Sequence, residues 1–301
     1  MTAALTEKIH EFKGEMLTDT HVKAIDAEKQ YVVDKRNEKY YYDNLVWAAD
    51  LITFYDILAL GNLKPGIKRN FGKSKEMIDQ GKPGESIFSL CLEVDLPTAY
   101  FGHISNGHFF YTQSKEGLGG IHRSVLSEML RKWDAIDKAT VFSWLDSFLK
   151  YNTFEISIPA LRDPNLAPEG KTGLMVSILI EYELFDKLNQ IGWDKEFRDE
   201  IENRIIKILS DTIYPGLQDK VEKQFSVTPL SIKDKVGSTG GAIVGWSFES
   251  PIPVVHKMQS VSKSVITPIP NIYQAGQWAY NPAGVPMCIM TGKLAADKIS
   301  K

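Results

Sequence analysis

Apolar residues at helical spacing open the chain. Leu5, Ile9 and Phe12 recur every three or four positions, which predicts a short amphipathic helix that ends near Gly14. Short apolar or alternating runs follow, and these predict strands over residues 15–25, 31–33, 39–42 and 45–49. The last of these runs is closed by Asp50 and is expected to be a buried strand.

The middle of the chain combines strand and helix patterns. Residues 86–94 alternate between apolar and polar, and residues 173–180 form a continuous apolar run, so both are expected to be strands. Apolar residues recur every four positions over 193–209 and predict a helix: Phe197, Ile201, Ile205 and Leu209. Together these patterns indicate an antiparallel sheet with helices on one side. Residues 61–84 are rich in Gly, Pro and Lys, and we expect a connection between two lobes there.

The C-terminal segment predicts a strand over 271–278, a loop over 279–284 and a helix over 285–299. Pro286 suits the first helical turn, because its missing N–H is not needed there. Gly276 lets the backbone approach a ligand closely, since no Cβ stands in the way. The unpaired amides at a helix start can hold negative charge, such as that on the pyrimidine oxygen of a reduced flavin. On shape alone, a plain strand–turn–helix that ends a domain remains the alternative.

Composition and charge exclude several classes of protein. The 301 residues carry a formal net charge of -3, so no excess of basic residues indicates that the chain binds nucleic acid. Cys91 and Cys288 lie far apart and outside any metal-like cluster, which favours a reducing, cytoplasmic compartment. The N-terminus lacks the apolar core of a signal peptide, and no apolar run is long enough to span a bilayer. Peripheral contact with a membrane stays open.

Few side chains suggest catalysis by the protein itself. His103 and His108 lie five positions apart with no carboxylate at ligand spacing, so we expect no metal site. The sequence has no Gly-x-Ser-x-Gly motif, which disfavours a hydrolase. No acid–base pair stands out, so the catalytic residues are left unknown.

The residues of the C-terminal segment resemble the flavin-contact motif of phytoene desaturases, carotenoid isomerases and retinol saturases. That motif runs as apolar–Tyr–x–Ala–Gly–x–Trp/Thr, then Pro–Gly–Gly–Gly–x–Pro, then Ser–Gly–x–x–Ala–Ala. The positions that match are Tyr273, Ala275, Gly276, Trp278, Pro282, Gly284, Pro286, Gly292, Ala295 and Ala296. Three positions depart from it: Gln277 replaces a frequent acidic residue, Ala283 interrupts the glycine triplet, and Thr291 replaces Ser.

Four other stretches resemble the same family in the same order. Residues 20–25 resemble the strand in which a valine, here Val22, meets the adenine with its backbone. Residues 45–50 resemble the family's Val–Val–x–Asn–Ala–Asp strand end and place Ala49 at the cofactor. Residues 162–171 resemble a turn before a substrate-domain strand, and residues 228–245 resemble the segment before the flavin motif.

The resemblance implies an α/β (α+β) fold, with a partial FAD-binding Rossmann-like domain (1–60 and 235–301) and an antiparallel-sheet substrate-binding domain (61–234). It implies a FAD-dependent oxidoreductase that acts on carbon–carbon bonds of an apolar isoprenoid, carotenoid or retinoid-like substrate, as a desaturase, saturase or isomerase. An amine oxidase-like enzyme is one alternative. The implied cofactor-binding residues are Val22, Ala49, Gly276, Gln277, Gly284, Val285, Pro286 and Met287.

One part of the family pattern is missing. A complete member opens with a strand, Gly-x-Gly-x-x-Gly and a helix, and the sequence contains no such fingerprint. We therefore expect that about the first two-fifths of the enzyme is absent, as in a fragment, a truncated frame or one half of a split enzyme with a separate Rossmann half. On this hypothesis the chain alone binds FAD weakly or not at all. A non-catalytic lipid-binding or interaction protein is the second alternative.

Overall fold

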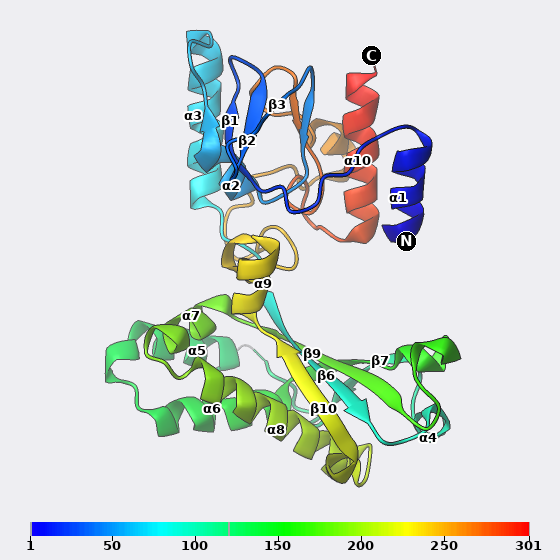
Figure 1. Ribbon diagram of the computed structural model, residues 1–301. Coiled ribbons are helices and arrows are strands. Elements are labelled where there is room, and N and C mark those ends of the chain that lie inside the picture. Colours follow the sequence, from blue (N-terminus) through cyan, green and yellow to red (C-terminus); the bar gives the residue numbers. More distant parts are fainter. Residues whose placement is uncertain (1, 120, 301) are drawn as a thin grey trace. The chain divides into compact units, whose positions relative to one another are not determined.

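The computed structural model describes residues 2–119 and 121–300. The chain divides into two compact units (Figure 1). Unit 1 comprises residues 1–82 and 248–301, and unit 2 comprises residues 83–247. The expected domain boundaries lay near residues 60 and 235, whereas the units divide at 82/83 and 247/248. The first boundary lies later because the helix after residue 64 packs on unit 1, with the Phe71 ring 5.0 Å from that of Tyr55.

Unit 1 contains two small sheets. The first has the order β3-β2-β1-β5, with β1 (Val22–Asp26), β2 (Tyr31–Asp34), β3 (Lys39–Tyr41) and β5 (Leu58–Ala59). The second pairs β4 (Leu45–Trp47) with β11 (Ile272–Gln274) in parallel. The helices of this unit are α1 (Thr2–Glu11), α2 (Leu51–Ile57), α3 (Pro65–Gln80) and α10 (Val285–Ile299).

Unit 2 is built on a five-stranded antiparallel sheet of order β10-β6-β9-β8-β7. Its strands are β6 (Ser86–Val94), β7 (His108–Thr112), β8 (Thr153–Ser157), β9 (Thr172–Ile180) and β10 (Val221–Val227). Its helices are α4 (Thr98–Gly102), α5 (Ile121–Arg131), α6 (Lys138–Tyr151), α7 (Tyr182–Gln190), α8 (Asp194–Thr212) and α9 (Pro229–Val236). Figure 1 shows α6 and α8 running along one side of this sheet.

The period-2 pattern of the strands decides which face of the sheet is covered. Along β6 every second residue from Ser86 to Val94 is buried, and the same alternation runs along β9 from Thr172 to Ile180. The buried residues of β6, β8 and β9 join those of α6 and α8 in one continuous core. The opposite face, which includes Cys91, Met175 and Ser177, is half-buried or exposed and forms the open face of the sheet.

Two sequence predictions in unit 1 are wrong. Residues 15–25 were expected to form one strand, but β1 begins only at Val22, because Asp19 adopts a positive φ of 52° within a turn. Residues 61–84 were expected to be a loose connection, but most of them form α3. Pro65 stands in the first turn of α3, and Phe71 and Ile78, two turns apart, bury one face of it. The two interior glycines lower helix propensity without preventing the helix.

Unit 1 also contains a carboxylate that stabilises the hairpin of β2 and β3. The side chain of Asp34 accepts hydrogen bonds from the backbone N–H groups of Arg36 and Glu38, each at 2.9 Å, and from Arg36 Nε at 3.0 Å. Burial alone would raise the pKa of Asp34, but these donors outweigh it and lower that pKa below its ordinary value. The charged carboxylate is therefore the form that the hairpin favours.

Acid is expected to weaken unit 1 partly through Asp34. Because its pKa is lower in the folded chain, its contribution is fully present above the unfolded pKa of about 4 and is lost as the pH falls through the folded pKa. Asp34→Asn should lower the free energy of unfolding at pH 7 and flatten its fall below pH ~4. Urea unfolding across pH measures this, with Asp43→Asn at an exposed position as the control. Equal pH profiles for wild type and Asp34→Asn would contradict the assignment.

Candidate functional site

The first candidate site lies where β4 and β11 end side by side. The two strands are parallel, with Tyr273 opposite Val46 and Gln274 opposite Trp47, so their carboxyl ends meet at one edge. The N–H of Ala275 continues the pairing with a 2.9 Å hydrogen bond to the carbonyl of Trp47. Ligands of parallel α/β sheets bind at this edge, outside the carboxyl ends of the strands.

Gly276 makes the turn at the end of β11. It has a φ of +83°, and a Cβ built on it would lie 3.4 Å from the carbonyl oxygen of Ala48. A side chain here would be strained by the backbone and would fill the space above the end of β4. The Gly276 N–H donates a 3.0 Å hydrogen bond to Thr291 Oγ1, which ties the turn to the first half of α10.

The start of α10 is the second part of this site. Gly284 precedes the helix with a φ of +132°, no side chain caps the helix, and Pro286 lies in its first turn. Val285 and Pro286 are exposed. The amides of an uncapped helix start carry partial positive charge, which favours an electron-rich or anionic ligand group. This arrangement fits the polar edge of a flavin ring.

The structure brings most of the expected cofactor-binding residues to one edge of unit 1. Gly276 and Gln277 follow β11, and Ala49 is exposed after β4, next to the Ala48 carbonyl that faces Gly276. The remaining members of this group lie at the start of α10: Gly284, Val285, Pro286 and Met287. Val22 belongs to the other sheet of unit 1, in β1. Whether these residues hold a cofactor stays a prediction.

Two contacts that hold this part of unit 1 together are not evident from the sequence. Thr291 stood out only as a departure from Ser, yet it is fully buried, and its hydroxyl links Gly276 to the carbonyls of Met287 and Cys288. The hydroxyl that Thr291 shares with the Ser of the family motif was the feature of the sequence that could have indicated this contact. Asp50 stood out only as the end of a strand motif, and it caps α2 by accepting the Thr53 N–H at 2.8 Å.

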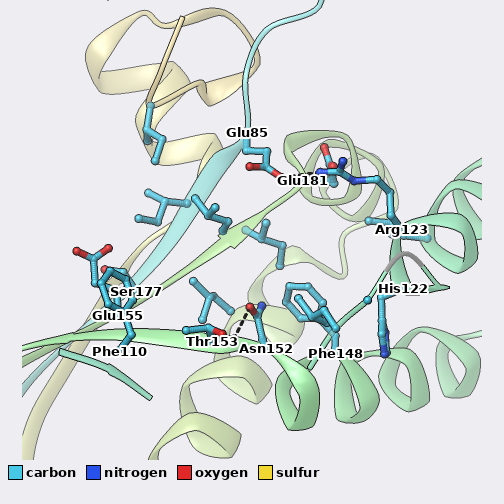
Figure 2. A pocket seen from close by; sticks show the side chains of 18 of the residues that line it. Glu85, Phe110, His122, Arg123, Phe148, Asn152, Thr153, Glu155, Ser177 and Glu181 are labelled. Atoms are coloured by element: carbon cyan, nitrogen blue, oxygen red, sulfur yellow. Dashed lines mark hydrogen bonds and ion pairs between the residues drawn. The ribbon is translucent and has the colours of Figure 1, made fainter. Parts of the chain in front are cut away.

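The second candidate site is a cavity of about 410 Å³ in unit 2 (Figure 2). It lies where β8 and β9 separate. Their pairing ends at Glu155 opposite Ser177, and the next two residues on the open face, Thr153 and Leu179, line the cavity instead. Its volume falls within the range of small-molecule sites, about 300–1,000 Å³.

Apolar side chains make most of the cavity wall. They come from the strands, α5, α6 and the loop before α5: Ile87, Phe110, Leu118, Leu126, Trp144, Phe148, Ile178, Leu179 and Ile180. Three charged groups lie together at one part of the rim, where Arg123 bonds Glu85 at 2.6 Å and Figure 2 shows Glu181 close by, whereas Glu155 lies elsewhere, beside Ser177. The cavity therefore suits an apolar molecule with polar groups near one part of its outline.

Among the described residues, the lining of the cavity contains no cysteine and no cluster of metal ligands. Burial raises the pKa of the Cys91 thiol, which keeps it protonated and poorly nucleophilic at neutral pH. Within residues 2–119 and 121–300, no group of three or more His, Cys, Asp or Glu side chains is placed to hold a metal ion.

Comparison with known proteins identifies the family. The family model of flavin containing amine oxidoreductases matches residues 108–300, more than half of the chain. The chain therefore belongs to this family, whose cofactor is FAD.

The similar curated proteins are carotenoid desaturases. A phytoene desaturase (neurosporene-forming) of Rhodobacter capsulatus is 27% identical over 144 residues, which is 47% of this chain and 26% of that protein. A phytoene desaturase of Fusarium fujikuroi is 26% identical over 165 residues, 50% of this chain and 28% of that protein. The chain thus matches only about a quarter of the length of these relatives.

Solved structures show the same α/β fold. An oxidoreductase from Methanosarcina mazei superposes with a TM-score of 0.57 at 15% identity, over 99% of this chain and 53% of that chain. A triple mutant of putrescine oxidase gives a TM-score of 0.57 at 10% identity, over 99% of this chain and 52% of that chain. The mixed fold expected from the sequence is confirmed. None of the helices in the described residues has both the length and the apolar character needed to cross a bilayer.

Proposed function

We propose that this chain forms the flavin-ring contact and the substrate cavity of a FAD-dependent oxidoreductase that acts on carbon–carbon bonds of an apolar, isoprenoid-like molecule. The apolar cavity of unit 2, in a chain of a flavin family, is the observation that carries the proposal. The desaturases of phytoene and related carotenoids among its relatives support an isoprenoid substrate. Unit 1 is the partial FAD-binding domain and unit 2 the substrate-binding domain in this proposal.

The chemistry divides between cofactor and protein. FAD, when bound, supplies the two-electron acceptor or donor that no side chain of the cavity provides. Gly276 keeps the end of β11 free of side-chain atoms, and the amides at the start of α10 stabilise negative charge on the ring edge. The aromatic and aliphatic wall in unit 2 orients the substrate and excludes water.

We also propose a partner for β4 and β11. A parallel sheet of two strands is unusual, because parallel sheets normally lie buried within larger α/β folds. Val46 in β4 is 39% exposed, although it belongs to a run that was expected to be buried. A dinucleotide-binding half with further parallel strands would cover this pair and supply the Gly-x-Gly-x-x-Gly turn that the sequence lacks. Peripheral contact of the chain with a membrane surface is a separate proposal, and it does not depend on the fold described above.

The cavity is tested by substitution of one exposed lining residue. Leu179→Arg places a charge in the apolar wall and should weaken binding of a linear isoprenoid hydrocarbon such as farnesene about tenfold or more. Displacement of the neutral dye N-phenyl-1-naphthylamine measures this. Met175→Arg is the matched control, because Met175 lies on the same strand and face but outside the cavity.

The same assay separates the alternatives. If farnesene displaces no dye from the wild type, or if both arginine variants behave alike, the cavity is not the substrate site. Displacement by putrescine at lower concentration than by farnesene would favour the amine oxidase alternative. Farnesene binding without any flavin binding would favour a non-catalytic lipid-binding protein.

A further inference from the structure

Two hydrogen-bond donors in the cavity of unit 2 have no partner among the described residues. Asn152 Nδ2 and Trp144 Nε1 are buried and unpaired, and both side chains line the cavity. Each residue is only 6% exposed, so neither donor is satisfied by bulk water. Buried donors without partners are rare in folded proteins, and a bound molecule is one of the few things that explain them.

The orientation of the Asn152 amide is fixed by its neighbours. Its oxygen Oδ1 accepts the N–H of Thr153 at 2.8 Å. If the amide were flipped, its NH₂ would face the Thr153 N–H, and two donors would meet. The group left over is therefore the NH₂, which can only donate. Figure 2 shows the end of this amide directed towards the cavity, beside Phe148.

The two donors lie at different places along the cavity. Trp144, Phe148 and Asn152 are spaced four residues apart along α6 and its C-cap, and therefore share one face. The rings of Trp144 and Phe148 stack with centroids 4.7 Å apart. Trp144 and Asn152 are two turns apart, about 12 Å along the helix axis. A single ligand oxygen is therefore expected to bond only one of the two donors, because they lie at different places along the aromatic wall.

Five other polar residues of the lining are already bonded to protein. The pairs are Thr153 with Thr112 at 2.7 Å, Ser177 with Ser89 at 2.8 Å, Glu155 with His108 at 2.8 Å, and Glu85 with Arg123 at 2.6 Å. The NH₂ of Asn152 and the N–H of Trp144 are thus two donors that a ligand can satisfy without breaking any of these bonds, and the NH₂ of Asn152 is the one beside the gap between the strands. It lies where β8 and β9 separate, at the residue before β8.

The charges of the lining select against an anion. Three carboxylates line the cavity, from Glu85, Glu155 and Glu181, against the cation Arg123. Arg123 is already paired with Glu85. A ligand carboxylate or phosphate would meet net negative charge, whereas a neutral carbonyl oxygen would not.

We propose that the cavity binds an elongated apolar molecule with a neutral carbonyl oxygen at one end, and that the NH₂ of Asn152 donates a hydrogen bond to this oxygen. The inference rests on the proposed function, because it takes the same cavity as the substrate site. It narrows the substrate class from apolar, isoprenoid-like molecules in general to isoprenoid-like ketones or aldehydes. Asn152 is a binding residue in this proposal.

The test compares two ligands of one carbon skeleton. Geranylacetone, an isoprenoid ketone, and the hydrocarbon of the same skeleton are titrated into the full chain against N-phenyl-1-naphthylamine. Asn152→Leu removes the donor and keeps a branched side chain with the same number of non-hydrogen atoms, and should lower the affinity ratio of ketone to hydrocarbon roughly three- to tenfold. Trp144→Phe keeps the aromatic ring and removes the other donor, and should leave the ratio unchanged.

A further variant guards against misfolding. Asn152→Asp retains the acceptor for the Thr153 N–H and replaces the NH₂ by oxygen, so it should lower the ratio at least as far. Equal ratios in the wild type, Asn152→Leu and Asn152→Asp would overturn the proposal and leave the proposed function standing. A loss confined to Trp144→Phe would also overturn it. Failure of both ligands to displace the dye from the wild type would contradict both the Asn152 proposal and the proposed function.

Discussion

Replacement of Phe154 by alanine is expected to destabilise unit 2 by about 3–5 kcal/mol, the largest loss of stability that we predict. Phe154 lies on the covered face of β8, is only 1% exposed and belongs to the continuous core of the unit. Its ring lies 6.4 Å from that of Tyr111 on the neighbouring strand β7. Removal of the ring leaves a cavity that the surrounding helices and strands fill only partly.

Phe110 supplies the matched control on the open face of the same sheet. It lies on β7 opposite Glu155 and is 66% exposed, so Phe110→Ala should change stability by less than about 1 kcal/mol. Urea unfolding of both variants, with hydrogen exchange of β8 and β9 to assign the transition to unit 2, measures the difference. Equal losses in the two variants would show that the covered and open faces have been assigned wrongly.

Replacement of Gly276 by valine is expected to act on both stability and flavin binding. The residue has a φ of +83°, where a β-branched side chain is strongly disfavoured, so we expect a loss of about 1–3 kcal/mol. The new Cβ would lie 3.4 Å from the Ala48 carbonyl oxygen, and its methyl groups would fill the edge where β4 and β11 end. Flavin affinity should fall about tenfold or more, because the ring can no longer approach the backbone.

Gly292→Val separates the site from general effects of a larger residue. Gly292 lies in α10, is exposed, has no unusual φ, and a Cβ there meets nothing within 4 Å. We expect this variant to retain the stability and the flavin affinity of the wild type. Calorimetric unfolding and a flavin titration of both variants check the pair. A Gly276→Val chain that binds flavin like Gly292→Val would place the flavin elsewhere.

The sheet of unit 2 was predictable because its signal is local. Alternation along 86–94 and the apolar run over 173–180 identify β6 and β9 without knowledge of their neighbours. The run over 173–180 was expected to be a strand because it is continuously apolar, and two of its apolar residues, Met175 and Leu179, are exposed on the open face. Large apolar residues on an open face cannot be told from core residues by composition, and only pairing in three dimensions separates them.

The candidate site in unit 1 was predictable in its parts but not in its assembly. Gly276, Gly284 and Pro286 mark the boundaries between the strand, the turn and the helix over 271–299, and α10 begins and ends as expected. The parallel pairing of β11 with β4 joins residues more than two hundred positions apart, and no local pattern reports such a contact. The link from Thr291 to Gly276 depends on that pairing and was missed for the same reason.

The cavity of unit 2 could not be predicted from the sequence. It exists because β8 and β9 stop pairing after Glu155 and Ser177, although both strands continue. Asn152 is a polar residue at the end of a helix, where such residues are common, so no pattern in the sequence singles it out. Its importance appears only when burial and hydrogen-bond partners are known.

The most direct test of the central claim is a fluorescence anisotropy titration of riboflavin and FAD with the purified chain. If β11 and α10 contact the flavin ring, riboflavin should bind weakly and saturably, with an affinity within about threefold of that of FAD, and Gly276→Val should lower both affinities about tenfold or more. The affinities of riboflavin and FAD are expected to be similar because the sequence lacks the Gly-x-Gly-x-x-Gly turn that would bind the rest of FAD. No binding of riboflavin, or FAD binding that is a hundredfold tighter and insensitive to Gly276→Val, would contradict the claim.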